Sequence, residues 1–216
     1  MLLLAFDTAT PAVTVALHDG AGVIAEESAF DARRHGELLA IFIEKVLSSA
    51  GAGRRDLTAV AVGAGPGPYT GLRVGLITAR VLASTLGIRL DGFCSLDVIG
   101  AQATAEAAGR DYLVATDARR REVYWARYSP SGVRLAGPGV GPPAALPAGL
   151  PVAGDGGLLY PELAGRSIGP RFPAAAQLAV LAASRAAAGQ PPLAAEPLYL
   201  RRPDAREPGQ PKRVTP

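Results

Sequence analysis

Two aspartates could carry chemistry because each follows an apolar run that opens one half of the chain. Asp7 ends the run Leu2–Phe6, and Asp117 ends the similar run Tyr112–Thr116. In nucleotide-handling folds, carboxylates placed this way hold Mg²⁺ or water beside phosphates. Asp is also a common turn former, so both positions have a structural alternative. Beyond Asp117, the Ala-Arg-Arg segment 118–120 puts bulky side chains where a phosphate would need glycine. We therefore expect any two-sided phosphate clasp to be damaged.

A glycine-rich segment, 63–73, joins a strand to a helix and contains Gly65 and Gly67. A helix start of this kind favours phosphate through its free N–H groups. However, no Lys-Ser or Lys-Thr pair closes the segment, and the dinucleotide fingerprint Gly-x-Gly-x-x-Gly does not occur in register. Pro66 and Pro68 also remove two N–H donors. The pattern favours a rigid turn. The alternative is a weak, vestigial nucleotide site formed by Asp7, Gly65, Gly67 and Asp117.

The remaining reactive side chains do not assemble a catalytic or metal site. His18 and His35 are far apart in the sequence, and no His or Cys pair has metal-ligand spacing. Cys94 lies between Phe93 and Ser95, as expected of a small core residue, and no neighbouring base can be identified. We predict no catalytic residue and no metal ligand in this chain.

Small residues recur every four positions in the helix expected at Thr70–Leu86, which gives one smooth face for close approach of another helix. The preceding helix, Glu37–Ser49, is apolar on more than one side, although a surface helix needs a single apolar stripe. We predict a partner interface on these two helices; the alternative is that they pack only on each other and on the sheet. The predicted interface residues are Leu39, Phe42, Val46, Gly71, Leu72, Gly75, Ala79, Leu82 and Ala83.

Alternating strand and helix patterns position these residues, and the first half reads β-β-β-α-β-α-β-α. This order predicts an α/β layered sheet, mostly parallel with an antiparallel edge. A third helix is expected to be capped by Ser95 and to end near Gly109. The expected strands are Leu2–Phe6, Val13–Leu17, Val23–Ser28, Ala59–Gly63 and Ile88–Phe93.

The second half is a weak and eroded repeat of the first. Strands are expected at Tyr112–Thr116, Glu122–Tyr128 and Val133–Leu135, and the Pro- and Gly-rich segment 136–151 excludes a helix there. A short strand with a glycine loop at Pro151–Gly157 and an Ala-rich helix at Pro173–Ala188 follow. We predict a first subdomain at 1–109, a reduced second one at 110–200, and a mobile tail at 201–216.

Composition agrees with a globular protein rather than a membrane or disulfide-rich one. Hydrophobic residues make up 49% of the 216 residues and charged residues 19%, so the chain can bury a core. No apolar run reaches signal-peptide or membrane-span length, and a lone cysteine cannot form an internal disulfide. We therefore expect a cytoplasmic protein. The net charge is only +3, and the arginines are scattered rather than gathered in a stripe. This composition permits contact with RNA but does not indicate it.

Several segments, in order along the chain, resemble the TsaB (YeaZ) family. They are Asp7-Thr8-Ala9-Thr10 followed by Val13–Leu17, Arg34–Leu39, Gly63–Gly75, Asp117–Trp125 and Pro197–Arg201. The resemblance covers the chain to about residue 201. It departs from the family at Pro68 and Tyr69, where Ser and Phe are common, and in the Pro- and Gly-rich segment after Leu135.

The resemblance implies an actin-like fold of the ribonuclease H-like group, related to sugar kinases and Hsp70, with a complete first subdomain and a reduced second one. It also implies a non-catalytic subunit of the complex that forms threonylcarbamoyladenosine beside the anticodon of tRNA. The partner would be the paralogue TsaD, which carries the metal-binding histidines and the transfer chemistry, with the ATPase TsaE joining the pair. Pairing would use the first two helices, and the chain alone would form a homodimer. No cofactor would be held firmly by this chain, although ATP or ADP could bind in the complex.

Two rival functions remain open at this stage. An independent actin-like kinase or ATPase would use Asp7, the Gly65–Gly67 loop and Asp117. A peptidase, a label often given to the family, would need a nucleophile or metal site that the sequence does not supply. The sequence also leaves open whether this chain touches tRNA, whether nucleotide binds at its interface, and whether it is a dimer alone.

Overall fold

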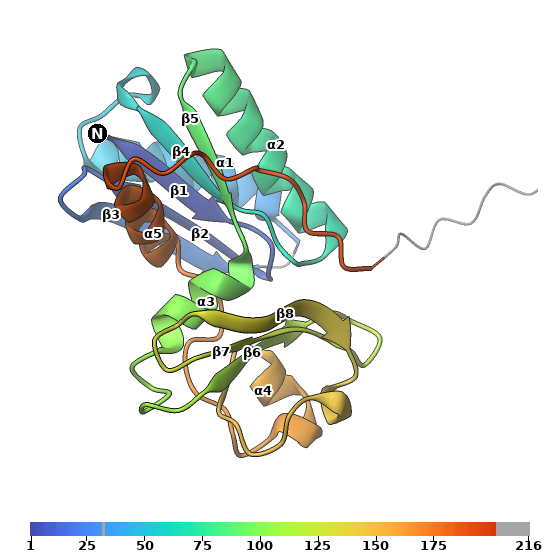
Figure 1. Ribbon diagram of the computed structural model, residues 1–216. Coiled ribbons are helices and arrows are strands. Elements are labelled where there is room, and N and C mark those ends of the chain that lie inside the picture. The colour runs from blue at the N-terminus through green and yellow to red at the C-terminus, as the bar shows by residue number, and fades with distance from the viewer. Residues whose placement is uncertain (32, 202–216) are drawn as a thin grey trace, which may run out of the picture.

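The computed structural model describes residues 1–31 and 33–201 and contains two β-sheets in two lobes (Figure 1). The first sheet has the strand order β3-β2-β1-β4-β5. β1 pairs antiparallel with β2 and β2 with β3, whereas β4 and β5 continue parallel from β1. The bounds are β1 Leu3–Asp7, β2 Ala12–His18, β3 Val23–Phe30, β4 Ala59–Gly63 and β5 Arg89–Phe93. A three-strand meander that continues into parallel strands is the ribonuclease H-like arrangement, so the predicted actin-like α/β fold is confirmed.

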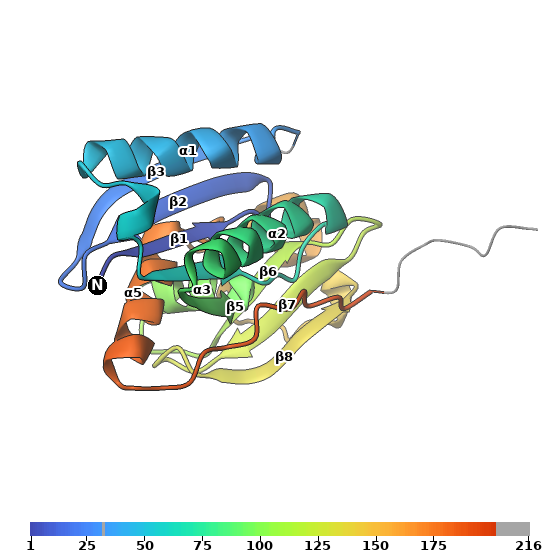
Figure 2. The ribbon, with the colours of Figure 1, turned by 90° about the horizontal axis from the view of Figure 1, so that it is seen from above.

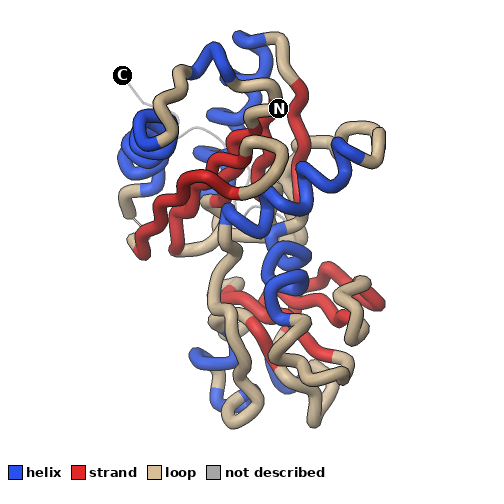
Figure 3. The backbone as a smooth tube through the Cα atoms, turned by 90° about the vertical axis from the view of Figure 1, so that its left-hand side faces the viewer, coloured by secondary structure: helices blue, strands red, loops and turns tan. Residues whose placement is uncertain are grey.

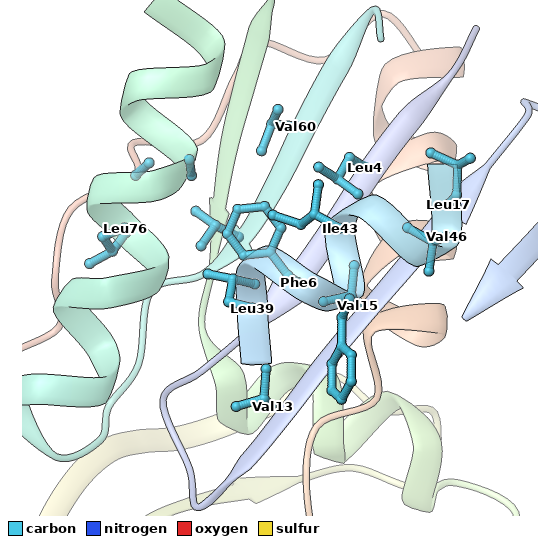
Figure 4. Close-up of a cluster of buried hydrophobic side chains, with 14 of the residues drawn as sticks. Leu4, Phe6, Val13, Val15, Leu17, Leu39, Ile43, Val46, Val60 and Leu76 are labelled. Atoms are coloured by element: carbon cyan, nitrogen blue, oxygen red, sulfur yellow. The ribbon is translucent and has the colours of Figure 1, made fainter. Parts of the chain in front are cut away.

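Two helices cover one face of this sheet. α1 (His35–Ser49) packs mainly on β2 and β3, and α2 (Tyr69–Leu86) packs mainly on β4 (Figure 2). Successive side chains of a strand point to opposite faces, so Leu4 and Phe6 of β1 meet these helices while Leu3 and Ala5 face away. Figure 4 shows the resulting core, in which labelled side chains of α1 lie close to those of β1 and β2: Leu39, Ile43 and Val46 against Phe6, Val15 and Leu17.

The other face of the first sheet is covered by α5 (Ala175–Ala187), which returns from the far end of the sequence. Leu178, Ala179 and Ala182 of α5 lie in one buried cluster with Leu3 and Ala5 of β1. The predicted division at residues 109/110 is therefore wrong for this helix, because its apolar face closes the core of the first lobe. The small alanine side chains let the helix approach the sheet closely.

The second sheet has the order β8-β7-β6-β9 and lies in the other lobe (Figure 3). Its strands are β6 Tyr112–Asp117, β7 Val123–Tyr128, β8 Arg134–Gly141 and β9 Val152–Ala153. α3 (Ser95–Ala103) packs on one face, and α4 (Gly156–Leu159) lies against β6, with short 3₁₀ helices at Pro143–Ala145 and Pro161–Leu163. Another 3₁₀ helix, Arg54–Asp56, follows α1.

Three local expectations differ from the structure in this region. β8 extends to Gly141 rather than ending at Leu135, because an edge strand tolerates proline and glycine. α3 ends at Ala103 rather than near Gly109. Ser95 does not cap that helix: the capping position is Cys94, and the Ser95 hydroxyl is engaged elsewhere. Of the predicted tail 201–216, residues 202–216 lie outside the described part of the chain.

A C-terminal strap, residues 190–201, links the two lobes along the side of α2 and β5 (Figure 1). The backbone N–H of Leu198 donates to the carbonyl of Ala64 at 2.9 Å, and Arg80 of α2 donates to the carbonyl of Ala195. At its end, Arg201 donates to the carbonyl of Ala118 at the turn between β6 and β7. The strap therefore joins the first lobe to that turn.

Candidate functional site

Asp7, the first candidate residue, is buried at the carboxyl end of β1 and is 1% exposed. Its Oδ2 accepts a 2.5 Å hydrogen bond from the Ser95 hydroxyl, and its Oδ1 accepts one of 2.7 Å from the backbone N–H of Ala9. Burial raises the pKa of Asp7 to about 6, although these hydrogen bonds and the nearby His35 oppose the shift. A Cβ added at Gly63 would lie 1.8 Å from Oδ2, so the carboxylate is enclosed on that side too.

The glycine loop lies directly on the turn that follows Asp7. A Cβ added at Gly67 would lie 1.9 Å from the carbonyl oxygen of Ala9, so the two backbones are in contact. Gly65 has a φ of +90°, a conformation that disfavours other residues, and its carbonyl accepts a 2.7 Å hydrogen bond from the N–H of Ser95. The loop is therefore held against β1 and α3 as a closed turn.

Asp117 lies at the end of β6 in the second lobe and is tied to its own neighbours. Its Oδ1 accepts a hydrogen bond from the Tyr160 hydroxyl and another from the backbone N–H of Arg119, each of 2.8 Å. Its backbone N–H donates to Asp155 Oδ1 at 3.1 Å. Asp155, which sequence reasoning missed, is 3% exposed, and burial raises its pKa to about 6. The sequence signal that could have identified Asp155 is the Gly-Asp-Gly-Gly segment 154–157. In the structure, its first glycine lies too close to the Ala115 carbonyl for any side chain to fit.

The backbone after Asp117 adopts a left-handed turn without glycine. Arg119, Arg120 and Arg121 have φ angles of 62°, 55° and 61°. Each such residue costs roughly 1–2 kcal/mol relative to the right-handed region. All three side chains are exposed, and the turn is braced by the contact of Arg201 with Ala118. The arginines therefore stand where a phosphate-binding loop would present glycine N–H groups.

A Mg²⁺–nucleotide does not fit the four predicted residues. Both oxygens of Asp7 are engaged within the protein, and the side chain is 1% exposed. The backbone of Gly67 contacts the carbonyl of Ala9, so a phosphate cannot lie between these two residues. Among the described residues, no group of three or more His, Cys, Asp and Glu side chains could hold a metal ion. These residues are thus positioned as internal supports.

The predicted partner-interface residues are mostly buried in the chain's own core, and this part of the prediction is wrong. On α2, a Cβ added at Gly71 would lie 2.5 Å from the Thr8 carbonyl, and one added at Gly75 would lie 2.5 Å from Thr8 Oγ1. The small residues therefore allow α2 to sit on the chain's own β1 loop rather than on a partner. Buried residues of the predicted interface are Leu39, Phe42, Val46, Gly71, Leu72, Gly75, Ala79 and Ala83, and Leu82 is partly buried.

The outward faces of the same helices carry exposed apolar side chains that the sequence analysis did not select. Ile77 and Val81 of α2 are each 59% exposed and lie one helical turn apart. Ile41 of α1 is 42% exposed. At the start of α2, the exposed ring of Tyr69 stacks on Tyr199 of the C-terminal strap, with a centroid distance of 5.6 Å. The signal available in the sequence was the position of Ile77 and Val81 opposite the small-residue stripe.

A family model described as "TsaD: tRNA N6-adenosine threonylcarbamoyltransferase" matches residues 13–165. A Mycobacterium tuberculosis H37Rv protein named as uncharacterized is 45% identical over 94% of this chain and 93% of its own length. A similarly named Mycobacterium leprae protein is 44% identical over 95% of this chain, which spans only 56% of that relative. The Escherichia coli protein named "tRNA threonylcarbamoyladenosine biosynthesis protein TsaB" is 34% identical over 59% of this chain and 55% of its own length.

Two solved structures whose titles carry the YeaZ name superpose on this chain. The structure titled "YeaZ from Pseudomonas aeruginosa" superposes with a TM-score of 0.79 and 26% identity, covering 92% of this chain and all of that one. A second Pseudomonas aeruginosa structure, described as similar to the peptidase YEAZ, has a TM-score of 0.80 and 28% identity over 93% of this chain and 99% of its own.

None of the helices in the described part of the chain has the length and apolar character that a membrane span requires.

Proposed function

Because this chain belongs to the TsaB (YeaZ) family, we propose that it is the non-catalytic partner subunit of the complex that makes threonylcarbamoyladenosine on tRNA. Relatives that carry the TsaB name are described as biosynthesis proteins for this modified nucleoside. The partner in this proposal is a TsaD protein, which supplies the transfer chemistry. TsaE joins the pair, and tRNA is engaged through the whole complex.

The observation that carries the non-catalytic assignment is the internal use of Asp7. An actin-like enzyme would need this carboxylate free to organise Mg²⁺ and water beside a phosphate. Here Ser95 and Ala9 occupy its two oxygens, and Gly63 lies directly against Oδ2. In this proposal the chain holds no cofactor firmly, although ATP or ADP can bind in the complex. The same features argue against the rival function of an independent kinase or ATPase.

The proposed pairing surface is the outward side of α1 and α2, centred on Ile41, Ile77 and Val81. Ile77 and Val81 are neighbours on α2, and exposed apolar side chains that lie together mark interaction sites. Since α1 and α2 cover the same face of the first sheet, a partner can contact both helices at once (Figure 2). This surface replaces the buried stripe predicted from the sequence, and the same face would form a homodimer when the chain is alone.

The test is to mix the purified chain with the TsaD protein of the same organism and measure the mass by size-exclusion chromatography with light scattering. Val81→Arg places a charge at the centre of the surface, so we expect the heterodimer to be lost. Leu158→Arg is the matched control, because Leu158 is 56% exposed but lies on α4 of the other lobe. Pairing that survives Val81→Arg would contradict the proposed surface. Failure of the unsubstituted chain to pair, together with ATP hydrolysis by the chain alone, would favour the ATPase.

A further inference from the structure

A small cavity lies where the starts of α1 and α2 meet the turn between β6 and β7. Its volume is about 260 Å³, below the roughly 300–1,000 Å³ typical of sites for whole drug-sized ligands. Its walls come from the loop after β1, from both helix starts, and from Arg119 of the second lobe. Figure 1 shows the start of α2 facing the second lobe, which explains how Arg119 reaches this position. The cavity has the size for one chemical group of a larger ligand.

The cavity is lined by groups that favour an anion. The side chains that can donate hydrogen bonds or carry positive charge are Thr10, Thr70, Arg33, His35 and Arg119. Among the lining residues in the described part of the chain, none carries a carboxylate. Two guanidinium groups approach from different elements, and planar guanidinium groups suit the oxygens of phosphate. The charged side chains that line the cavity in the described part of the chain are therefore all positive.

The walls are ordered by hydrogen bonds within the protein, so the cavity is formed in advance. The Thr8 hydroxyl donates to the carbonyl of Gly71 at 2.8 Å, and His35 Nε2 lies 2.8 Å from the carbonyl oxygen of Thr10. These contacts fix the start of each helix against the loop after β1. A preformed site loses less conformational entropy on binding than a mobile one.

The two arginines differ in how they are held, and both remain able to bind. Within the described residues, the Arg33 guanidinium makes no hydrogen bond or ion pair, and the residue is exposed. Arg119 Nη1 lies 3.3 Å from Asp117 Oδ2, but its side chain is 65% exposed. A solvent-exposed pair of this kind contributes little energy, so a doubly charged group competes with it effectively.

We propose that this cavity binds a phosphoryl group through Arg33 and Arg119, with the hydroxyls of Thr10 and Thr70 as further donors. The group belongs to a larger molecule, either the backbone of an RNA or the phosphates of a free nucleotide. The proposal that the cavity binds a phosphoryl group does not rest on the proposed function. The identification of RNA as the source of that group does rest on it. The site is separate from Asp7 and Gly67, where a phosphate does not fit.

The experiment is an NMR titration of the ¹⁵N-labelled full chain with inorganic pyrophosphate at low salt, repeated with ATP and with unmodified tRNA. The backbone amides of Gly36, Thr70 and Gly71, which line the cavity, are expected to shift with pyrophosphate. Arg33→Gln and Arg119→Gln should each weaken binding about tenfold, since hydrogen bonds to charged groups are strong. Arg33→Lys should keep part of the affinity because it keeps the charge. Added salt should weaken binding in every arm.

Arg55→Gln is the matched control, because it removes the same charge from an exposed position at the other end of α1. A tenfold loss for tRNA in the two cavity variants identifies RNA as the source, and a loss confined to ATP identifies a nucleotide. Either result supports the site. The proposal is overturned if pyrophosphate, ATP and tRNA leave these amides unshifted, or if both cavity variants bind as tightly as Arg55→Gln. Pairing with TsaD is measured separately, so its failure is distinguishable from this one.

Discussion

Replacing Asp7 by Asn removes a negative charge that the fold buries at the end of β1. The side chain is 1% exposed, and burial raises its pKa from 3.8 to about 6. Asparagine has the same shape, and its Oδ1 can still accept the 2.7 Å hydrogen bond from the N–H of Ala9. Its amide can donate to the Ser95 hydroxyl, so the contacts are largely kept while the charge is lost.

The sign of the effect follows from the direction of the pKa shift. Between pH 3.8 and about 6, the folded protein binds more protons at Asp7 than the unfolded chain does. The free energy of unfolding therefore falls as the pH rises through this window. Each pKa unit corresponds to about 1.4 kcal/mol, so the loss amounts to about 3 kcal/mol above pH 6. Asp7→Asn escapes this loss because asparagine does not titrate.

The assay is urea unfolding of wild type and Asp7→Asn, followed by circular dichroism at several pH values. Other carboxylates, including the buried Asp155, titrate in both proteins, so their contributions cancel in the difference between the two free energies. We expect this difference to be small below pH 4, to grow in favour of the variant, and to level off above pH 6 at about 3 kcal/mol. The reasoning would be refuted if the two curves of unfolding free energy against pH were parallel. It would also be refuted if the stability of the variant relative to wild type fell between pH 4 and pH 7.

Four substitutions test the packing, three of them on α2 and one on β7 of the second sheet. Gly75→Leu should lower the urea midpoint by the equivalent of about 1–3 kcal/mol, since an added Cβ would lie 2.5 Å from Thr8 Oγ1; an unchanged midpoint would place Gly75 at an open surface instead. Leu72→Ala should cost about 2–5 kcal/mol, because Leu72 is fully buried. Ile77→Ala, at a position of the same helix that is 59% exposed, should change stability by no more than about 0.5 kcal/mol. Equal effects in thermal unfolding would show that the burial of α2 is misassigned. Tyr128→Phe should cost about 1 kcal/mol, because its hydroxyl donates a 2.8 Å hydrogen bond to a carboxylate on α3.

The architecture of the first lobe could be predicted from the sequence because its periodicities are strong. Continuous apolar runs at β1 and β4 and glycine stops after the helices fix both the type and order of the elements. The return of α5 to the first sheet was not predictable in the same way. Its pattern is Ala-rich, and small side chains can cover either sheet, so only the three-dimensional path of the chain decides.

The sequence predicts which residues share the small-residue face of α2, but it does not predict what that face contacts. Four-residue spacing shows that Gly71, Gly75 and Ala79 share one face of α2, but it does not show whether that face meets a partner or the chain's own sheet. The contact that decides is Thr8, which is more than sixty residues away in the sequence. The cavity was missed for the same reason, because Arg33 and Arg119 come from separate lobes and no spacing rule joins them.

The central claim, a non-catalytic partner subunit, is tested most directly by reconstituting threonylcarbamoyladenosine formation with TsaD, TsaE, the threonylcarbamoyl-adenylate synthase and tRNA, and measuring the modified nucleoside by mass spectrometry. We expect product formation to require this chain, to be lost with Val81→Arg, and to be unchanged with Asp7→Asn. Product formation that disappears with Asp7→Asn, while the complex with TsaD remains intact, would show that the carboxylate takes part in the chemistry and would contradict the claim.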